Sequence, residues 1–145
     1  MIAIGCDHSA IDLKEALMKH LRERGIEYKD FGCYTKESCD YPIYGKLAAN
    51  SVASGECEKG IVICTTGIGI SIAANKVKGV RAALCSDTYS AKMTRLHNDA
   101  NVLALGAGIV GVHLAIDILD TFLDTPFSEE EKHSRRICLL EDETE

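Results

Sequence analysis

61-IVICTTGIGISIAANK-76 is the stretch that decides the fold, because it joins a short buried-type strand to a helix through a glycine-rich turn. Similar short runs rich in β-branched and apolar residues recur along the chain and alternate with longer segments of helical period. This alternation indicates parallel strands that are joined by crossover helices. We expect strands near 1–6, 26–31, 60–64, 80–85 and 102–105.

Helical periodicity fills the segments between these strands. Leu13, Leu17 and Leu21 lie four residues apart and predict a helix over 11–24, which Gly25 closes as its C-terminal cap. Further helices are predicted at 42–54, 69–77, 88–97 and 110–123.

The end of the chain predicts one more helix after the last strand. Ser128 and Glu131 stand in capping-box spacing, which predicts a helix over 128–140. The acidic stretch 141-EDETE-145 is typical of a frayed, solvated tail. The predicted fold is therefore α/β: one domain over 1–145, with a Rossmann-like, doubly wound sheet of five mainly parallel strands, helices on both faces and an extra C-terminal helix.

Composition narrows the class of protein. The 145 residues suffice for one domain, and a formal charge of −6 argues against nucleic-acid binding, which depends on a cationic face. Apolar runs such as 61-IVIC-64 are far shorter than the roughly 20 residues that a membrane span needs. The strand-like start at Met1 lacks the basic region of a signal peptide. Seven cysteines without a CxxC pair indicate free thiols in a reducing cytoplasm and no zinc site.

Reactive residues follow four of the predicted strands. In an open α/β sheet, ligands bind in the crevice at the carboxyl ends of the strands, so these positions are candidates for a binding site. They are Cys6-Asp7-His8-Ser9, 64-CTTGIG-69, Ser86-Asp87 and Gly106-Ala107-Gly108.

The turn 64-CTTGIG-69 is the most informative of the four. Its glycines leave amide N–H groups uncovered at the start of a helix, where the helix dipole favours negative charge. The same environment favours the thiolate form of a cysteine at the strand end, which makes Cys64 a candidate reactive group. The alternative is a phosphate-binding turn in which Cys64 only packs.

The turn 106-GAGIVG-111 matches the dinucleotide pattern GxGxxG. The second strand with an acidic residue that this fingerprint requires does not follow, so a tight turn is the better interpretation. Asp87 lies 20 residues after Gly67, which keeps a nucleotide-binding or phosphate-binding module as an alternative function.

Several other polar residues have both a structural and a functional interpretation. His97-Asn98-Asp99 is either a polar helix end or part of a site, and the same holds for Asp7-His8 as a helix cap. Tyr41 precedes a proline and is either half-buried or aimed at a ligand. Lys132, His133, Arg135 and Arg136 form the one dense cationic group, which is either a solvated helix face or a phosphate contact.

Five motifs, taken together, identify a family resemblance that covers nearly the whole chain. The motifs are 5-GCDHSAIDLKEAL-17, 40-DYPIYG-45, 61-IVICTTGIGISIAANKVKGVRAA-83, 97-HNDANVLALG-106 and, more weakly, 132-KHSRR-136. They resemble the type B ribose-5-phosphate isomerases, which belong with the allose- and galactose-6-phosphate isomerases.

The resemblance implies an aldose–ketose isomerisation that proceeds through an enediolate without a metal or cofactor. It implies Cys64 as the base and His97 as the ring-opening histidine. Thr66 and the amides of Gly67 and Gly69 would form the oxyanion site. Around the sugar and its phosphate it implies binding by Asp7, His8, Tyr41, Asn98, Lys132 and Arg136.

The resemblance further implies a homodimer, or a dimer of dimers, in which the C-terminal arginine reaches the neighbouring subunit's site. No nucleic-acid or membrane partner is expected.

Five positions depart from the family pattern. Thr65 stands where glycine is common, Ser9-Ala10 replaces a Gly-Gly pair, and Lys132 replaces an arginine. Gly108 stands where many members carry a phosphate-binding arginine. Because lysine offers a point charge instead of a forked guanidinium, these changes open the alternative of a hexose 6-phosphate substrate in place of ribose 5-phosphate.

Overall fold

The computed structural model describes residues 1–141, and within them a single sheet of five strands is covered by helices on both faces. All strand pairs are parallel, and the strand order is β2-β1-β3-β5-β4. The strands are β1 Ile2–Cys6, β2 Tyr28–Asp30, β3 Lys59–Cys64, β4 Ala82–Leu84 and β5 Val102–Gly106. The helices are η1 His8–Ala10, α1 Ile11–Glu23, α2 Tyr41–Ala53, α3 Ile68–Asn75, α4 Thr88–Asn98, α5 Val112–Asp124 and α6 Glu131–Glu141.

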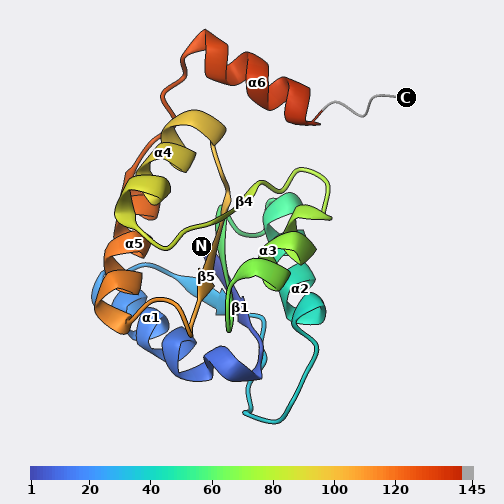
Figure 1. Cartoon of the computed structure of the whole chain (residues 1–145), viewed down its shortest axis with the longest axis vertical. Helices are drawn as coiled ribbons and strands as arrows, with labels where there is room; N and C mark the ends of the chain where they lie inside the picture. Colours follow the sequence, from blue (N-terminus) through green and yellow to red (C-terminus); the bar gives the residue numbers. More distant parts are fainter. Residues whose placement is uncertain (142–145) are drawn as a thin grey trace.

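The predicted α/β architecture is confirmed. Figure 1 shows α1, α4 and α5 on one face of the sheet and α2 and α3 on the other. Alternate residues of the central strands enter two separate cores, so that Ile61 and Ile63 pack toward α1 and α5 while Val62 and Cys64 pack toward α2 and α3. Burial on both faces explains why β3 has no polar side chain after Lys59.

Local signals set most of the boundaries within two residues of those predicted. At the end of α1, Gly25 adopts a φ of +69° and donates to the Arg22 carbonyl, while Ile26 donates to the Leu21 carbonyl. This pair of bonds is a Schellman motif, and it confirms Gly25 as the residue that closes the helix.

The predicted start of the last helix is wrong by three residues. Ser128 accepts the Glu130 N–H at 3.4 Å, and Glu129 has a φ of +59°, so this segment forms a turn and α6 begins at Glu131. The helix also extends to Glu141, whose carboxylate pairs with Arg81 at 2.6 Å, which contradicts the expectation of a solvated tail at this residue. The rest of the predicted tail, 142–145, lies outside the described residues.

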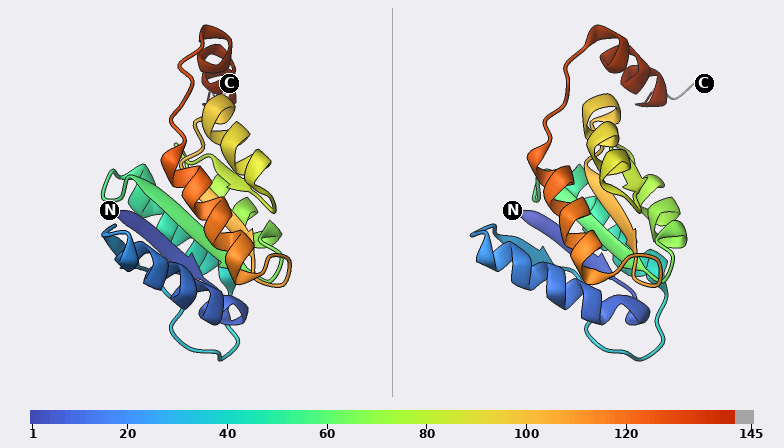
Figure 2. Two further views of the ribbon diagram at one scale, coloured as in Figure 1. Left: turned by 90° about the vertical axis from the view of Figure 1, so that its left-hand side faces the viewer. Right: turned by 60° about the vertical axis from the view of Figure 1, so that its left-hand side comes forward.

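Helix α6 lies apart from the two layers. Both views of Figure 2 show it beyond the end of α4, reached by an extended segment after α5. It exposes Leu139 and Leu140, each about two-thirds accessible. No helix within the described 1–141 combines the length and apolar character required to cross a bilayer.

The helix that follows β3 covers a different face of the sheet from the helices that follow its two neighbouring strands. The helices after its neighbours β1 and β5 pack on one face, while α3, which follows β3, packs on the other. In open parallel sheets this arrangement opens a crevice beside the carboxyl end of the strand. Cys64, the last residue of β3, therefore stands where the topology predicts a ligand site.

Candidate functional site

The turn after β3 places a thiol at the beginning of a helix. Cys64 is 5% exposed, and its Sγ accepts the backbone N–H of Gly67 at 3.1 Å. Gly67 is the N-cap of α3 with a φ of +76°, a conformation that side chains disfavour. The sulfur therefore receives a backbone hydrogen bond at the N-terminal end of α3.

The same turn supplies hydrogen-bond donors beside the sulfur. The first turn of a helix has no internal acceptor for its N–H groups, which applies to Gly69 in α3. Thr66 Oγ1 accepts the Ile68 N–H at 3.2 Å, so its own hydroxyl hydrogen remains to be donated elsewhere. The turn therefore offers a group of donors to an anionic oxygen.

Tyr41 lies over this turn. The residue starts α2, and its ring and hydroxyl lie 2.6–2.9 Å from the position that a Cβ on Gly69 would occupy. Glycine at 69 is therefore required for the close approach of the tyrosine. The phenol, which is 39% exposed, stands next to the donors of α3.

The turn after β1 brings a carboxylate to the same edge of the sheet. Asp7 is 6% exposed, and its Oδ1 accepts both the N–H of Ser9 at 3.0 Å and the hydroxyl of Ser9 at 2.6 Å. The Ser9 hydroxyl also bonds the hydroxyl of Thr65 at 2.8 Å, which joins the turns after β1 and β3. This link was not predicted, because nothing in the spacing of Ser9 and Thr65 signals a contact.

His8 stands beside Asp7 with a defined orientation. Its Nδ1 accepts the backbone N–H of Cys39 at 3.2 Å, so the ring proton is carried by Nε2. The ring can therefore donate one hydrogen bond from Nε2 to a ligand.

The turn that matched GxGxxG is closed on the protein itself. Ala107 and Gly108 donate their N–H groups to the carbonyls of Cys64 and Thr65 at 2.8 Å each, and Ile109 and Val110 donate to the Gly106 carbonyl. A dinucleotide phosphate would need these same donors. The backbone donors of 106–111 therefore hold the neighbouring turn at 64–69 in place and are not available to a nucleotide.

Asp87, the other feature behind the nucleotide alternative, caps α4. Both of its carboxylate oxygens accept hydrogen bonds from Ser90, through the backbone N–H at 2.6 Å and the hydroxyl at 2.9 Å. These bonds lower the pKa of Asp87. The carboxylate therefore has a structural function at the start of a helix.

The other thiols on the sheet lack such surroundings. Burial raises the pKa of Cys6 to about 12 and that of Cys85 to about 11. A thiol that stays protonated is a poor nucleophile and base. All seven cysteines are free, and Cys64 is the one that stands at the start of α3.

The remaining predicted site residues lie at the opposite end of the molecule. His97 and Asn98 end α4, just before β5 begins, and Lys132 and Arg136 lie on α6. The paired strands β3 and β5 run in parallel from Gly60↔Val102 to Cys64↔Gly106, and this length separates the two ends of the sheet by roughly 13 Å at about 3.3 Å per residue. The structure thus brings together Asp7, His8, Tyr41, Cys64, Thr66, Gly67 and Gly69, and keeps His97, Asn98, Lys132 and Arg136 away from them within one protomer.

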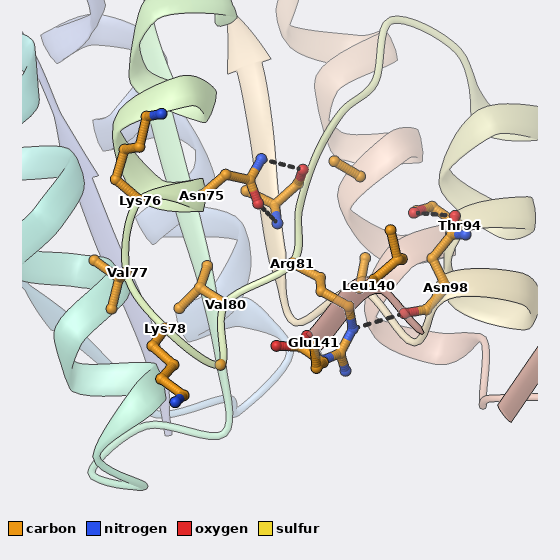
Figure 3. A pocket seen from close by; sticks show the side chains of 14 residues that line it. Asn75, Lys76, Val77, Lys78, Val80, Arg81, Thr94, Asn98, Leu140 and Glu141 are labelled. Atoms are coloured by element: carbon orange, nitrogen blue, oxygen red, sulfur yellow. Dashed lines mark hydrogen bonds and ion pairs between the residues drawn. The ribbon is translucent and has the colours of Figure 1, made fainter. Parts of the chain in front are cut away.

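A cavity of about 660 Å³ opens at this second end (Figure 3). It lies between the loop after α3 and the ends of α4 and α6, and Lys76, Arg81 and Asn98 are among its lining residues. Arg81 is fixed there by the Asn98 carbonyl at 2.9 Å and by Glu141. The thiol and the donor turn lie at the other end of β3, away from this cavity.

His97 stacks on His133 of α6 with ring centroids 4.3 Å apart and an interplanar angle of 16°. His133 is 6% exposed, although the sequence placed it in a cationic group that is otherwise on the surface. Burial, and then the neighbouring His97, lower the pKa of His133 below its ordinary value. Lys132 and Arg136 act in the same direction, while Glu130 opposes them.

Acidification is expected to loosen α6 from α4. Because the pKa of His133 is lower in the folded protein than in the unfolded chain, the unfolded chain binds more protons as the pH falls below about 6.5. The contribution of neutral His133 to the stability of the folded protein is complete above that pH and is lost as the pH falls below it. Hydrogen exchange of α6 amides, corrected for intrinsic rates, should be faster at about pH 5.5 than at about pH 7.5. His133→Phe, which keeps a ring but does not titrate, should abolish the difference, and equal protection of wild-type α6 at both pH values would contradict the prediction.

Taken together, the sheet topology and the turns define a class: an α/β protein with a cysteine and an anion-binding turn at the carboxyl edge of a parallel sheet. The model of the family described as Ribose/Galactose Isomerase matches residues 2–140, and the chain belongs to this family.

Three relatives illustrate the similarity. The chain is 49% identical over 136 residues to ribose-5-phosphate isomerase B of Escherichia coli K12, covering 94% of this chain and 91% of that protein. It is 44% identical over 127 residues to galactose-6-phosphate isomerase subunit LacB of Clostridium acetobutylicum, covering 88% and 73%. The structure of Clostridium thermocellum ribose-5-phosphate isomerase B aligns with a TM-score of 0.95 at 51% identity, covering 97% and 94%. The predicted family and fold are confirmed.

Proposed function

We propose that the protein interconverts ribose 5-phosphate and ribulose 5-phosphate, with Cys64 as the base. The observation that carries the proposal is the Cys64 sulfur, which lies at the start of α3 and accepts the Gly67 N–H. The high identity to ribose-5-phosphate isomerase B of Escherichia coli supports the substrate. We extend the proposal to a cytoplasmic location, which the seven free thiols favour.

The reaction needs one base and one anion site. Cys64 as a thiolate removes the proton from C2 of the open-chain aldose, the electron pair of the broken C–H bond forms the C1–C2 double bond, and the π pair of the C1 carbonyl moves onto O1 to give an enediolate. The thiol returns its proton to C1, the hydroxyl proton of O2 passes to O1, and the oxygen on C2 becomes the carbonyl of the ketose. The Gly67 amide donates to the Cys64 sulfur before proton transfer and is released when the thiolate becomes a thiol, so that it joins the hydroxyl of Thr66 and the amide of Gly69 in stabilising the negative oxygen. Each such donor contributes roughly 3 kcal/mol to the transition state. With these donors, the proposed mechanism needs no metal or cofactor.

The substrate spans the edge of the sheet in this proposal. Asp7 and Tyr41 bind sugar hydroxyls, and the Nε2–H of His8 donates to the phosphate. His97 opens the sugar ring, Asn98 binds a hydroxyl, and Lys132 and Arg136 neutralise the phosphate charge.

The second group of residues reaches the first through a second copy of the chain. Within one protomer, His97 and Arg136 lie at the other end of the sheet from Cys64, so we propose a homodimer, or a dimer of dimers, with shared sites. An apolar surface beside the Cys64 turn supports this proposal: Ile43 and Leu47 on α2 and Ile68 and Ile72 on α3 are 44–55% exposed. Each pair lies four residues apart and therefore on one helix face. Such a patch is typical of a protein interface.

A hexose 6-phosphate is the second candidate substrate. It is favoured by the 44% identity to a galactose-6-phosphate isomerase subunit and by Gly108, which carries no side chain next to Thr65. Comparison of kcat/KM for ribose 5-phosphate, allose 6-phosphate and galactose 6-phosphate decides between them. We expect the highest value for ribose 5-phosphate. A preference of about tenfold or more for a hexose, which corresponds to roughly 1.4 kcal/mol in transition-state binding, would reassign the substrate.

A further inference from the structure

Thr65 is bound to two neighbouring segments. Its hydroxyl bonds Ser9, and its carbonyl accepts the Gly108 N–H at 2.8 Å. A Cβ on Gly108 would lie 3.3 Å from the Thr65 methyl group, which is tighter than ordinary van der Waals contact. Three of the departures from the family pattern, Ser9, Thr65 and Gly108, therefore form one contiguous cluster beside Cys64.

The hydrogen-bond chain through this cluster has a fixed direction. A carboxylate accepts hydrogen bonds only, so the Ser9 hydroxyl hydrogen points to Asp7 Oδ1. Ser9 then has only lone pairs for Thr65, and Thr65 must donate its single hydroxyl hydrogen to Ser9. Thr65 Oγ1 can therefore only accept a hydrogen bond from a ligand.

Asp7 extends this acceptor character. Both bonds from Ser9 go to Oδ1, and every buried side-chain oxygen or nitrogen in residues 1–141 has a partner. Oδ2, which receives neither bond, therefore reaches the surface. Thr66, the next residue of the turn, keeps its hydroxyl hydrogen because its oxygen accepts from Ile68. The two adjacent threonines thus present opposite hydrogen-bonding character to the site.

We propose that Thr65 is a specificity-determining residue, which forms with Asp7 Oδ2 an acceptor-only edge that binds a hydroxyl group of the sugar and does not bind phosphate. Ser9 is the positioning residue that sets the polarity of this edge. This proposal rests on the proposed function, because the edge would orient the sugar phosphate in that same site. Hydroxyl groups can donate to this edge, whereas a phosphate would place lone pairs against lone pairs.

Thr65→Val tests the proposal because valine keeps the shape of threonine and removes the hydroxyl. We expect KM for ribose 5-phosphate to rise about fivefold to tenfold with kcat within about twofold, because one ground-state hydrogen bond is lost. Thr65→Ser should restore the wild-type KM. Thr65→Val should leave the inhibition constant of inorganic phosphate unchanged, because the anionic oxygens of phosphate find no hydrogen-bond donor at this edge and phosphate binds elsewhere. Thr121→Val on α5 is the matched control and should change neither constant.

Ser9→Ala supplies the second arm of the test. Without Ser9, Thr65 is free to turn its hydrogen toward the substrate, so KM should rise. In the double variant Ser9→Ala/Thr65→Val, KM should rise by no more than about the larger of the two single increases, because both side chains belong to one chain of hydrogen bonds. Additive losses in the double variant would overturn the coupling. Any one of three results would overturn the proposal. The first is a KM for Thr65→Val within about twofold of wild type, and the second is a Thr65→Ser variant as impaired as Thr65→Val. The third is an inhibition constant for phosphate that rises in parallel with KM.

Failure of the proposed function gives a different result. The same substitutions are also made in the Cys64→Ala background, where calorimetric titration with ribose 5-phosphate measures binding without turnover. Weaker binding by about fivefold to tenfold for Thr65→Val supports the edge even if Cys64 is not the base. Unchanged binding overturns it, whether or not the wild-type protein is an isomerase.

Discussion

Cys64→Ala is expected to lower kcat about 10³-fold while the protein stays folded, because a positioned general base contributes about 10²–10⁴-fold to proton transfer. The neighbouring side chains of the turn do not replace the thiol, because Thr65 and Thr66 carry hydroxyls, and the Asp7 carboxylate at the same edge of the sheet is bound to Ser9. The measurement is steady-state isomerisation, combined with thermal unfolding of the variant.

Cys57→Ala is the matched control for this variant. Cys57 is 2% exposed and belongs to the same core cluster as Cys64, so both substitutions remove a buried sulfur from one face of the sheet. Both variants should lose similar stability, and only Cys64→Ala should lose turnover. Retention of more than about a tenth of the wild-type kcat by Cys64→Ala would remove Cys64 from the role of base.

A heterodimer of Cys64→Ala and His97→Ala protomers is expected to regain about half of the wild-type activity, although each parent homodimer is nearly inactive. In a twofold-symmetric dimer with shared sites, one site of the heterodimer receives both substitutions and the other receives neither. Coexpression with two affinity tags allows the heterodimer to be purified and assayed.

The outcome separates two arrangements of the site. If Cys64 and His97 of the same protomer served one site, each site of the heterodimer would carry one substitution, and activity would stay at the level of the parents. That result would contradict the sharing of sites between subunits. A heterodimer of Cys64→Ala with wild type provides the reference, since it should also retain about half of the activity.

Much of the fold is predictable from the sequence, because the relevant signals are local. Continuous apolar strands such as 61–64 and the evenly spaced leucines of α1 follow from burial and periodicity, and Gly25 closes its helix through its left-handed backbone. The start of α6 escaped prediction because the Ser128 side chain caps a turn instead of a helix. Sequence spacing does not distinguish these two uses of the same residue.

The candidate site was predictable in its chemistry and less so in its geometry. Cys64 and the glycine turn follow from a strand that ends at a helix start. The bond between Ser9 and Thr65 joins residues 56 apart and depends on the parallel pairing of β1 and β3, which no local pattern encodes. The burial of His133 depends likewise on the placement of α6 against α4.

The close packing around the glycine turn limits how the site can change during evolution. A Cβ on Gly106 would lie 2.6 Å from the Thr66 backbone, and one on Gly67 would lie 2.8 Å from the Leu105 backbone, so neither position accepts a larger residue without moving the main chain. Ser9 and Thr65 are side chains that can be exchanged without such a shift. Mutational drift can therefore alter the preferred sugar through these two hydroxyls while the machinery for proton transfer is inherited unchanged.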